Sequence, residues 1–299
     1  MHILPSFLRK KEEAIIVVFG GEENLYERAK ILQLFEHHFK TKIQKISNLP
    51  EYKCTFFYKD KKYVNIIFTF AFNPRKDEVW EAYERHFKSK GVACGLPASI
   101  IVSHIKSNYN PQLILFFGIC GAFAGNITTT YLPSSGRELL FNSKFILPEE
   151  VGKHLPKRHL GFHNILQGKV EGHNATVIST NMLLQHLGIV DFEDWIKLWR
   201  NYISKDNPER KFDFKVAQKW TFEKGKEYSR VLSHFGHIID KESFTFIRNF
   251  RRKKLGIKLQ CSDVITQNIP LDTESDMIDW NKFASNVISA IEQCIIHEI

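Results

Sequence analysis

The sequence predicts a single α/β domain that spans residues 1–299 and has a sheet covered by helices on both faces. Apolar segments rich in β-branched residues alternate with amphipathic segments along the chain. The apolar segments are hydrophobic at consecutive positions, which is typical of strands buried on both faces. No linker, repeat or low-complexity segment divides the chain. These observations favour one α/β domain.

The first part of the chain contains the clearest strand signals. The continuous apolar run AIIVVF ends at Gly20-Gly21, and a segment with helical periodicity follows it. Pro97 suits the first turn of a later helix, because its missing N–H has no intrahelical partner there. In chain order we predict strand 14–19, helix 24–39, strand 62–72, helix 76–89, helix 96–108 and buried strand 113–118.

The second part of the chain is less regular. Residues 128–172 have weak periodicity, and we expect irregular strands and loops there. We expect helix 243–254 to be terminated by Gly256, a residue type common just after helices. The last 25 residues form a helix with an apolar stripe. The apolar stripe of this last helix consists of Trp280, Phe283, Val287, Ile291, Cys294 and Ile295. The other elements predicted in the second part of the chain are strand 175–180, helix 192–203 and strand 257–265.

The formal net charge of +9 has two interpretations. It indicates either an anionic partner or a solvated surface rich in lysine. The basic residues are spread along the chain, which favours the second interpretation. The run RNFRRKK at 248–254 suits the last turn of a helix, where cations interact favourably with the helix dipole. We therefore expect no nucleic-acid partner.

Cysteine usage and the chain start indicate a cytoplasmic protein. The five cysteines are far apart, odd in number and lack a CxxC pair, which is typical of free thiols in a reducing compartment. The first 14 residues become charged too early for a secretory signal. No apolar run approaches the roughly 20 residues of a membrane span. We expect a protein without membrane contact.

Three predicted strand ends carry candidate site residues. They are the segment Gly118–Gly121, the pair Asp240 and Glu242, and the pair Ser262 and Asp263. Ligands gather at the carboxyl ends of strands in open α/β sheets. Taken singly, the acidic pair also suits a helix start, and Ser-Asp suits a turn. Only the combination favours a binding site.

Histidine pairs do not add a metal site to this prediction. His234 and His237 are three residues apart, and His159 and His163 are four apart. A zinc site needs three or four convergent ligands, and no third partner is evident. We expect no metal and no cofactor.

Four segments taken together resemble the purine nucleoside phosphorylase and nucleosidase superfamily. They are LILFFGICGAFAG at 113–125, ATVISTNMLL at 175–184, HIIDKES at 237–243 and LGIKLQCSDVI at 255–265. This superfamily includes methylthioadenosine/adenosylhomocysteine nucleosidases and AMP nucleosidases. The resemblance runs from Ile15 to the C-terminus. It implies a three-layer αβα sandwich with a mixed central sheet, and a homo-oligomer, since the family usually builds its sites near subunit interfaces.

The resemblance also implies a role for each motif. Cleavage of an N-ribosidic bond builds positive charge on the sugar and negative charge on the departing purine. Asp263 would protonate the base at N7, with Ser262 orienting the acid. Glu242 would accept hydrogen bonds from the ribose 2′ and 3′ hydroxyls. The remaining contacts implied are Leu183 and Leu184 against the base, and Cys120 and Gly121 lying flat against the nucleoside.

The first loop favours hydrolysis over phosphorolysis. Family phosphorylases carry a GDPxRa loop after the first strand, whereas this loop reads GGEENLYERA. It keeps Gly20 and Arg28, but extra residues lie between them, and the acids among these would repel phosphate. In the nucleosidases a Glu in this loop activates water, and Glu23 is the nearest match, with Glu22 beside it. A phosphorylase remains the alternative, and so does an inactive relative that binds nucleosides.

Two departures from the family pattern bear on these alternatives. Lys241 stands where the family usually has Met, and the loop after Gly125 lacks the usual Gly-Asp-Val. Lys241 would pair with Glu242, reach a 5′-phosphate of a nucleotide such as AMP, or point to solvent. The departures favour an inactive relative, whereas Glu242 with Ser262-Asp263 favours an enzyme.

Overall fold

A computed structural model describes most of the chain. The residues described are 11–20, 25–46, 51–70, 96–124, 126, 129–139, 148–155, 159–166, 173–180, 199–200, 204, 211–240, 242–264 and 279–298.

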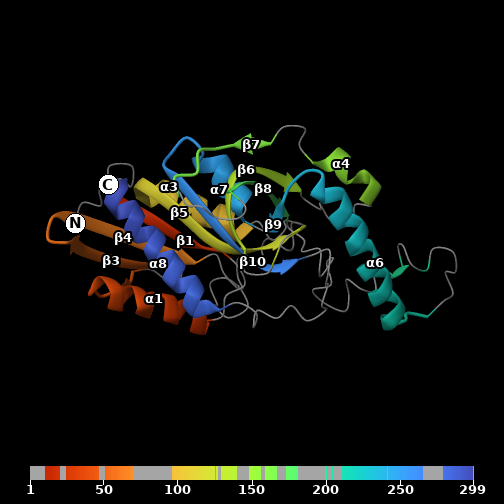
Figure 1. Ribbon diagram of the computed structural model, residues 1–299, viewed down its shortest axis with the longest axis horizontal. Helices are drawn as coiled ribbons and strands as arrows, with labels where there is room; N and C mark the ends of the chain where they lie inside the picture. The colour runs from red at the N-terminus through yellow and green to blue at the C-terminus, as the bar shows by residue number, and fades with distance from the viewer. Residues whose placement is uncertain are drawn as a thin grey trace, which may run out of the picture.

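Strands and helices alternate along the described residues (Figure 1). The elements of the first part are β1 (Glu12–Phe19), α1 (Leu25–Phe39), β2 (Gln44–Lys45), β3 (Glu51–Tyr58), β4 (Lys62–Phe70), α3 (Leu96–Asn108) and β5 (Tyr109–Ala122). The elements of the second part are β6 (Thr130–Leu139), η3 (Pro148–Glu150), α4 (Val151–His154), β7 (Leu160–Gly161), β8 (His173–Thr180), α6 (Phe214–Ser233), β9 (Ile238–Asp240), α7 (Ser243–Phe250), β10 (Leu255–Val264) and α8 (Trp280–His297).

The strands form one mixed sheet in the order β10-β6-β8-β9-β5-β1-β4-β3-β2, with β7 beside β6. β5 is parallel to β1 and β10 and antiparallel to β9. Because β10 pairs with β5 as well as with β6, the strands β5, β10, β6, β8 and β9 close into a ring. The predicted α/β class and mixed sheet are confirmed.

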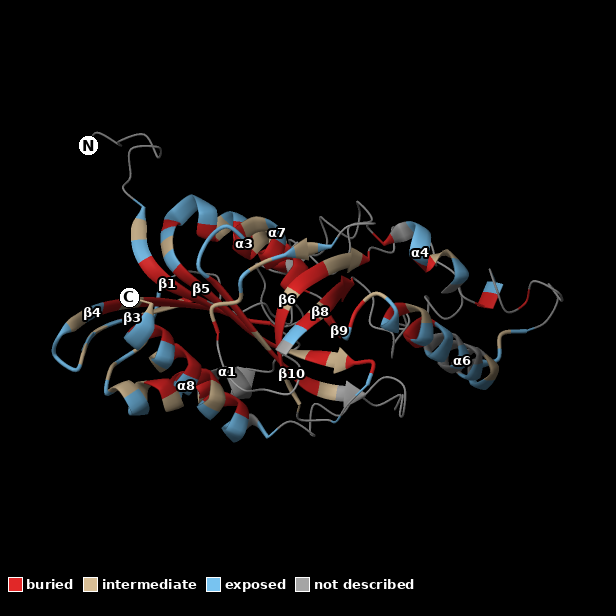
Figure 2. Cartoon of the chain, turned by 45° about the horizontal axis from the view of Figure 1, so that its top comes forward, coloured by how far each residue is buried: buried red, intermediate tan, exposed pale blue. Residues whose placement is uncertain are grey.

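Among the described residues, α3 and α7 pack on one face of the central strands, and α1 and α8 pack on the other (Figures 1 and 2). Successive side chains of β5 point to opposite faces of the sheet. Ile114 and Phe116 pack with α3 and α7, whereas Leu115 and Phe117 pack with α1 and α8. A third cluster joins α4 and α6 to β8 and β9. The central strands β1 and β5 are red along most of their length in Figure 2, as expected of strands buried on both faces.

Several sequence predictions coincide with the structure. The predicted helix 96–108 is α3, and the stripe of the last helix is buried from Phe283 to Ile295 on α8. Strand 14–19 lies within β1, and strand 175–180 lies within β8. The four described cysteines are free thiols, as predicted. The predicted helices 76–89 and, for the most part, 192–203 lie outside the described residues.

Two predicted boundaries are wrong. β5 does not stop at Gly118 but continues to Ala122, because β10 and β9 pair with its last residues. Helix α7 ends at Phe250 rather than Lys254, and Gly256 lies inside β10. A Cβ atom at Gly256 would lie 2.8 Å from side-chain atoms of Leu115 and Leu166. Close packing in the sheet therefore explains the glycine at position 256, and this residue does not terminate helix α7.

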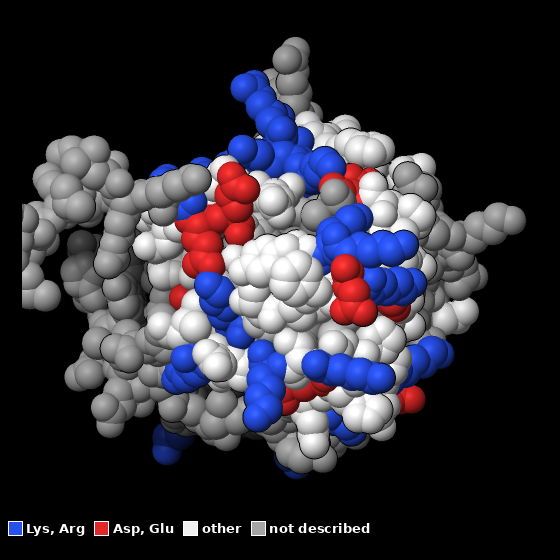
Figure 3. All heavy atoms as spheres, turned by 90° about the vertical axis from the view of Figure 1, so that its left-hand side faces the viewer, with Lys and Arg blue, Asp and Glu red and all other residues white. Residues whose placement is uncertain are grey.

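Charge on the face around the β3–β4 hairpin is dispersed. Lysine and arginine side chains are interspersed there with acidic and uncharged ones (Figure 3). This pattern is typical of the solvated basic surface that the sequence favours. Within the described part of the chain, none of the helices has the length and apolar character needed to span a lipid bilayer.

The end of β1 generates a stability prediction. A Cβ atom at Gly20 would lie 2.3 Å from Cζ of the fully buried Phe116, whose ring packs against Phe246 of α7. Gly20→Ala is therefore expected to lower the free energy of unfolding in urea by about 1–3 kcal/mol, as overpacking does. Gly152→Ala is the matched control, because its nearest contact would be an ordinary 3.7 Å. Equal stability of the two variants would contradict the packing described here.

Candidate functional site

The end of β5 is the place where one sheet edge changes partner. β10 follows one edge of β5 from Ile114 to Ala122, so β1 and β9 both occupy the opposite edge. β1 occupies that edge up to Phe117, and β9 takes over at Gly121. The Gly20 N–H donates to the Phe117 carbonyl at 2.7 Å, just where β1 leaves the sheet. Ligand sites in α/β sheets form where neighbouring strands part in this way.

Gly121 is the meeting point of the motifs that the sequence singles out. Its Cα faces Asp263 of β10 on one edge and Ile239 of β9 on the other. The next residue of β9 is Asp240, and Glu242 follows two positions later. The fold therefore brings the strand ends near residues 121, 240 and 263 together, as the resemblance implies.

A bulge in β10 lies beside this point. Cys261 pairs with Cys120 and Asp263 pairs with Gly121, so Ser262 is the extra residue between two ladder positions. The Ser262 hydroxyl donates to the Cys120 carbonyl at 3.3 Å. Bulges are common next to active sites because they change the direction of the side chains that follow. The backbone of Cys120, rather than its thiol, takes part in this arrangement.

Asp240, the last residue of β9, is a buried carboxylate with 3% exposure. The Ser179 hydroxyl of β8 donates to its Oδ1 at 2.5 Å. The Ser243 backbone N–H donates to its Oδ2 at 3.0 Å, and the Ser243 hydroxyl donates to the same oxygen. A buried carboxylate is costly unless donors surround it, and these contacts satisfy that requirement.

Ser179 links three elements at once. Its Oγ donates to Asp240 of β9 and accepts the backbone N–H of Phe244, in the first turn of α7, at 2.8 Å. Ser179 is 4% exposed, so water does not replace these partners. The resulting network fixes the end of β8, the end of β9 and the start of α7 relative to one another.

Glu242 is the N-cap of α7 and is 9% exposed. Its side chain makes no capping hydrogen bond, because the Asp240 carboxylate already accepts the first N–H groups of the helix. The sequence analysis left helix capping as an alternative role for Asp240 and Glu242. In the structure, Asp240 is the acid whose side chain caps α7. Glu242 therefore occupies the N-cap position of α7, but its carboxylate makes no capping hydrogen bond.

The pKa shifts agree with this burial. Burial raises the pKa of Asp240, although the hydrogen bonds from Ser179, Ser243 and the Glu242 backbone oppose the shift. Burial also raises the pKa of the Cys120 thiol well above its usual range, with further contributions from Cys261 and Asp240. Cys120 is therefore a neutral thiol in the core shared with α3 and α7, and is unsuited to nucleophilic chemistry.

The predicted site residues differ in how far the structure describes them. Cys120, Gly121, Glu242 and Ser262 are described, and the backbone of Asp263 is described. The remaining predicted positions lie outside the described residues, and they are Glu23, Leu183, Leu184 and Lys241.

Sequence reasoning missed the two serines around Asp240. Ser179 stands in the apolar run ATVIST, where a polar residue at a buried strand position was the available signal. Of the histidines His234 and His237, His237 has a structural role, because its Nδ1 accepts a hydrogen bond from the Thr176 backbone N–H at 3.0 Å. The described residues contain no group of three histidines, cysteines or acids that could hold a metal ion.

The fold is similar to that of solved nucleosidases. No protein-family model matches the chain, and no curated protein matches its sequence. A Campylobacter jejuni 5′-methylthioadenosine/S-adenosyl homocysteine nucleosidase superposes with a TM-score of 0.52 at 12% identity, over 94% of this chain and 99% of that chain. An Arabidopsis thaliana 5′-methylthioadenosine nucleosidase gives 0.51 at 12% identity, over 97% of each chain.

A third similar structure contains a ligand. It is a Helicobacter pylori nucleosidase mutant with 5′-methylthioadenosine in the active site, with a TM-score of 0.50 at 10% identity, over 96% of this chain and 99% of that chain. At these identities the comparisons establish the fold alone. The α/β fold with a mixed sheet that the sequence resemblance implied is thereby confirmed.

The serine network generates a second stability prediction. Ser179→Ala removes a donor to Asp240 and leaves the Phe244 N–H without its acceptor. We expect a loss of about 1–3 kcal/mol in the free energy of unfolding, because buried polar groups lose their partners. Ser233→Ala, at an exposed serine in the last turn of α6, should change stability by less than about 0.5 kcal/mol. Indistinguishable denaturation curves for the two variants would contradict the network.

Proposed function

We propose that this protein cleaves the N-ribosidic bond of a purine nucleoside or nucleotide by hydrolysis. One observation carries the proposal: Gly121 pairs with Asp263 on one edge and with the strand leading to Asp240 and Glu242 on the other. The first and the last motif of the sequence resemblance, which contain Gly121 and Asp263, are about 140 residues apart along the chain. Their convergence at one strand end supports a common site.

The proposed chemistry divides the reaction between two carboxyl groups. Asp263 protonates N7 of the departing purine, so that the base leaves without a full negative charge. Ser262, held by the Cys120 carbonyl, orients that acid. Glu242 accepts hydrogen bonds from the ribose hydroxyls, a role that requires an ionised carboxylate near the sugar. The absence of a side chain at Gly121 lets the nucleoside lie against the backbone.

Water activation is assigned to the loop after β1. Gly20 ends that strand beside Phe117, close to where β5 changes partner, and Glu23 follows three residues later. The proposal gives Glu23 the role of general base, with Leu183 and Leu184 contacting the purine. Phosphorolysis is the alternative, and the adjacent acids Glu22 and Glu23 oppose it because they would repel phosphate.

The substrate class draws support from the solved structures with similar folds. Two of them are nucleosidases of 5′-methylthioadenosine, and a third binds that nucleoside in its active site. We propose the same broad class here, with the base and the 5′ substituent open. Lys241 provides a cation near the ribose carboxylate in sequence, which keeps nucleotides such as AMP within the proposed class.

We also propose that the chain forms one domain with the three-layer αβα architecture of this superfamily. The apolar clusters that unite α1 with α8 and α3 with α7 on opposite sides of β5 support three layers. The ring closed by β10 bends the sheet at one end, so the layers would meet around a curved rather than a flat sheet.

An assay of reaction products tests the proposed function. Incubation with a panel of purine nucleosides and nucleotides should release free base and free ribose without phosphate. Asp263→Asn should lower kcat by about 10²–10⁴ while KM changes little, because the amide keeps the shape but supplies no acidic proton. Asp60→Asn is the matched control, since Asp60 lies in the exposed β3–β4 turn with φ 55°, which Asn tolerates.

The same assay separates the alternatives. Ribose 1-phosphate formed only with added phosphate would replace hydrolysis by phosphorolysis. Binding of nucleosides without cleavage would identify an inactive relative. Full activity of the Asp263→Asn variant would remove Asp263 from the mechanism.

The oligomeric state is a further expectation of this proposal. The superfamily that the sequence resembles usually builds its sites near subunit interfaces. We therefore propose that this chain forms a homo-oligomer. Light scattering at micromolar concentration should give at least twice the 35.0 kDa mass of the chain. A monomer mass at that concentration would rule out an interface that contributes to the site.

A further inference from the structure

The turn end of the β3–β4 hairpin exposes one face of its two strands. Side chains alternate between the two faces along each strand. Phe56 and Val64 pack into the cluster of α1 and α8, whereas Ile67 packs into the cluster of α3 and α7 on the other face. From Ile67 toward the turn this second face loses its cover, since Asn65 is half-buried and Tyr63 is exposed.

Two aromatic side chains lie on this exposed face. Phe57 of β3 and Tyr63 of β4 are cross-strand partners, and their rings pack edge to face with centroids 5.6 Å apart. Phe57 is 66% exposed and Tyr63 is 61% exposed, the highest values among the exposed large hydrophobic side chains of the described residues. Single exposed apolar side chains are ordinary on protein surfaces, whereas a contiguous aromatic pair is typical of an interaction surface.

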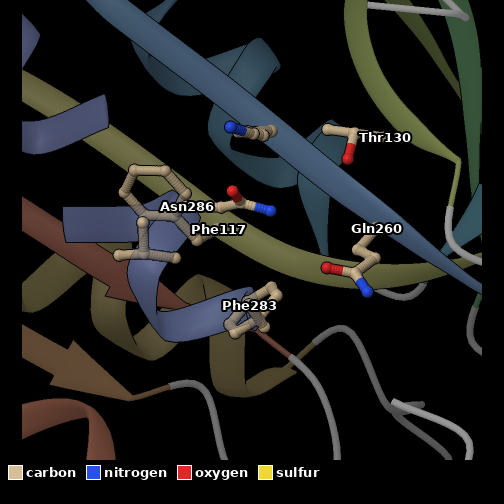
Figure 4. Close-up of a pocket in the computed structure, with 7 residues that line it drawn as sticks. Phe117, Thr130, Gln260, Phe283 and Asn286 are labelled. Carbon is tan, nitrogen blue, oxygen red and sulfur yellow. The ribbon is translucent and has the colours of Figure 1, made fainter. Parts of the chain in front are cut away.

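Other aromatic side chains of the sheet are covered by helices. On one face Phe116 of β5 packs against Phe246 of α7, with ring centroids 4.9 Å apart. On the other face α8 lies over β5, and Figure 4 shows Phe117 and Phe283 from these two elements lining the same small hollow. The exposure of the aromatic pair is therefore particular to the hairpin.

Charged residues of both signs flank the aromatic pair. The turn 59–61, with the sequence Lys-Asp-Lys, is exposed at one end of the pair. On the side of β1, Glu12 accepts a hydrogen bond from Asn65 Nδ2 at 2.9 Å and contacts Lys53 Nζ, and its side chain is still 41% exposed. Figure 3 shows uncharged surface in the middle of the face around the hairpin, with basic and acidic side chains around it. An apolar centre with a polar rim is the usual anatomy of a protein–protein interface.

We propose that this face binds the same face of a second copy of the chain, across a two-fold axis through the aromatic pair. A two-fold interface is self-complementary, because the same patch is used on both subunits. The half-turn exchanges the two sides of the patch, so the turn of one copy, with its two lysines, lies opposite Glu12 of the other. A rim of a single sign would oppose this pairing, whereas a rim of both signs favours it.

This contact is separate from any interface that completes the candidate site. Glu12 pairs with Tyr109 at the start of β5, whereas the candidate site lies around Gly121 at its end. The inference therefore does not depend on the proposed enzymatic function, and a second copy bound here leaves the candidate site accessible.

Sedimentation equilibrium of the full chain at increasing concentrations tests the proposal. The double variant Phe57→Glu/Tyr63→Glu places like charges at the centre of the contact, so the mass of the assembly should fall to about half of that of the unchanged protein. Lys153→Glu, at an exposed lysine of α4, is the matched control and should keep the full mass. An unchanged mass in the double variant would overturn the proposal, and so would an unchanged protein that stays monomeric throughout.

Charge reversal provides evidence that a folding defect cannot imitate. Glu12→Lys and Lys61→Glu should each weaken association by about tenfold, because two like-charge contacts replace two attractive ones in every symmetric pair. An equal mixture of the two variants should recover the affinity, since each reversed charge then meets an opposite charge. A mixture that associates no more tightly than either variant alone would rule out the two-fold arrangement.

Discussion

The pairing of β5 with three other strands is the constraint on which the rest of the structure depends. One edge is held by β10 along its length, and the other is shared by β1 and then β9. Packing on the face of the sheet keeps Gly118 small, because a Cβ atom there would lie 3.1 Å from Cε1 of Phe116 and 3.2 Å from Cδ2 of Leu259. Because β9 pairs with β5 at Gly121, the residues that follow, Asp240 and Glu242, lie on the edge of β5 opposite the end of β10.

The buried Asp240 carboxylate is the main consequence of that pairing. β9 is only three residues long, so its position depends on contacts beyond the sheet ladder. Ser179 and Ser243 provide them, and they attach β8 and α7 to the same carboxylate. Because Asp240 caps α7, the side chain of Glu242 is not needed for that purpose. Asp240 is thus a structural acid that joins β9 to α7, whereas the role of Glu242, two residues later, stays a proposal.

Hydrophobic periodicity within a short segment predicts those strands and helices that are encoded by neighbouring residues. The apolar runs of β1 and β8 and the helices α3 and α8 were predicted because their periodicity is strong. The hairpin strand β3 and the helix α6 were not predicted, since their pairing or packing depends on distant segments. Strand β6, whose pairing with β8 shifts register between Leu132 and Ser135, lies where irregular strands were expected. Gly256 was misread because a glycine after a helix looks the same whether it ends the helix or makes room for Leu115. At the site, motif order located Gly121, Glu242 and Ser262, whereas Ser179 acts through a partner 61 residues away. The roles of all the predicted site residues stay predictions, and for Glu23, Leu183, Leu184 and Lys241 the positions too lie outside the described residues.

The central claim is that a purine nucleoside binds where β5 exchanges β1 for β9. A crystal structure with a C-nucleoside analogue of adenosine tests it most directly, because the carbon–carbon bond to ribose resists cleavage. The account predicts the base against the backbone of Gly121 with N7 facing Asp263, and the ribose hydroxyls within hydrogen-bond distance of Glu242. An analogue bound at another surface, or a Glu242 carboxylate turned away from the sugar, would contradict it.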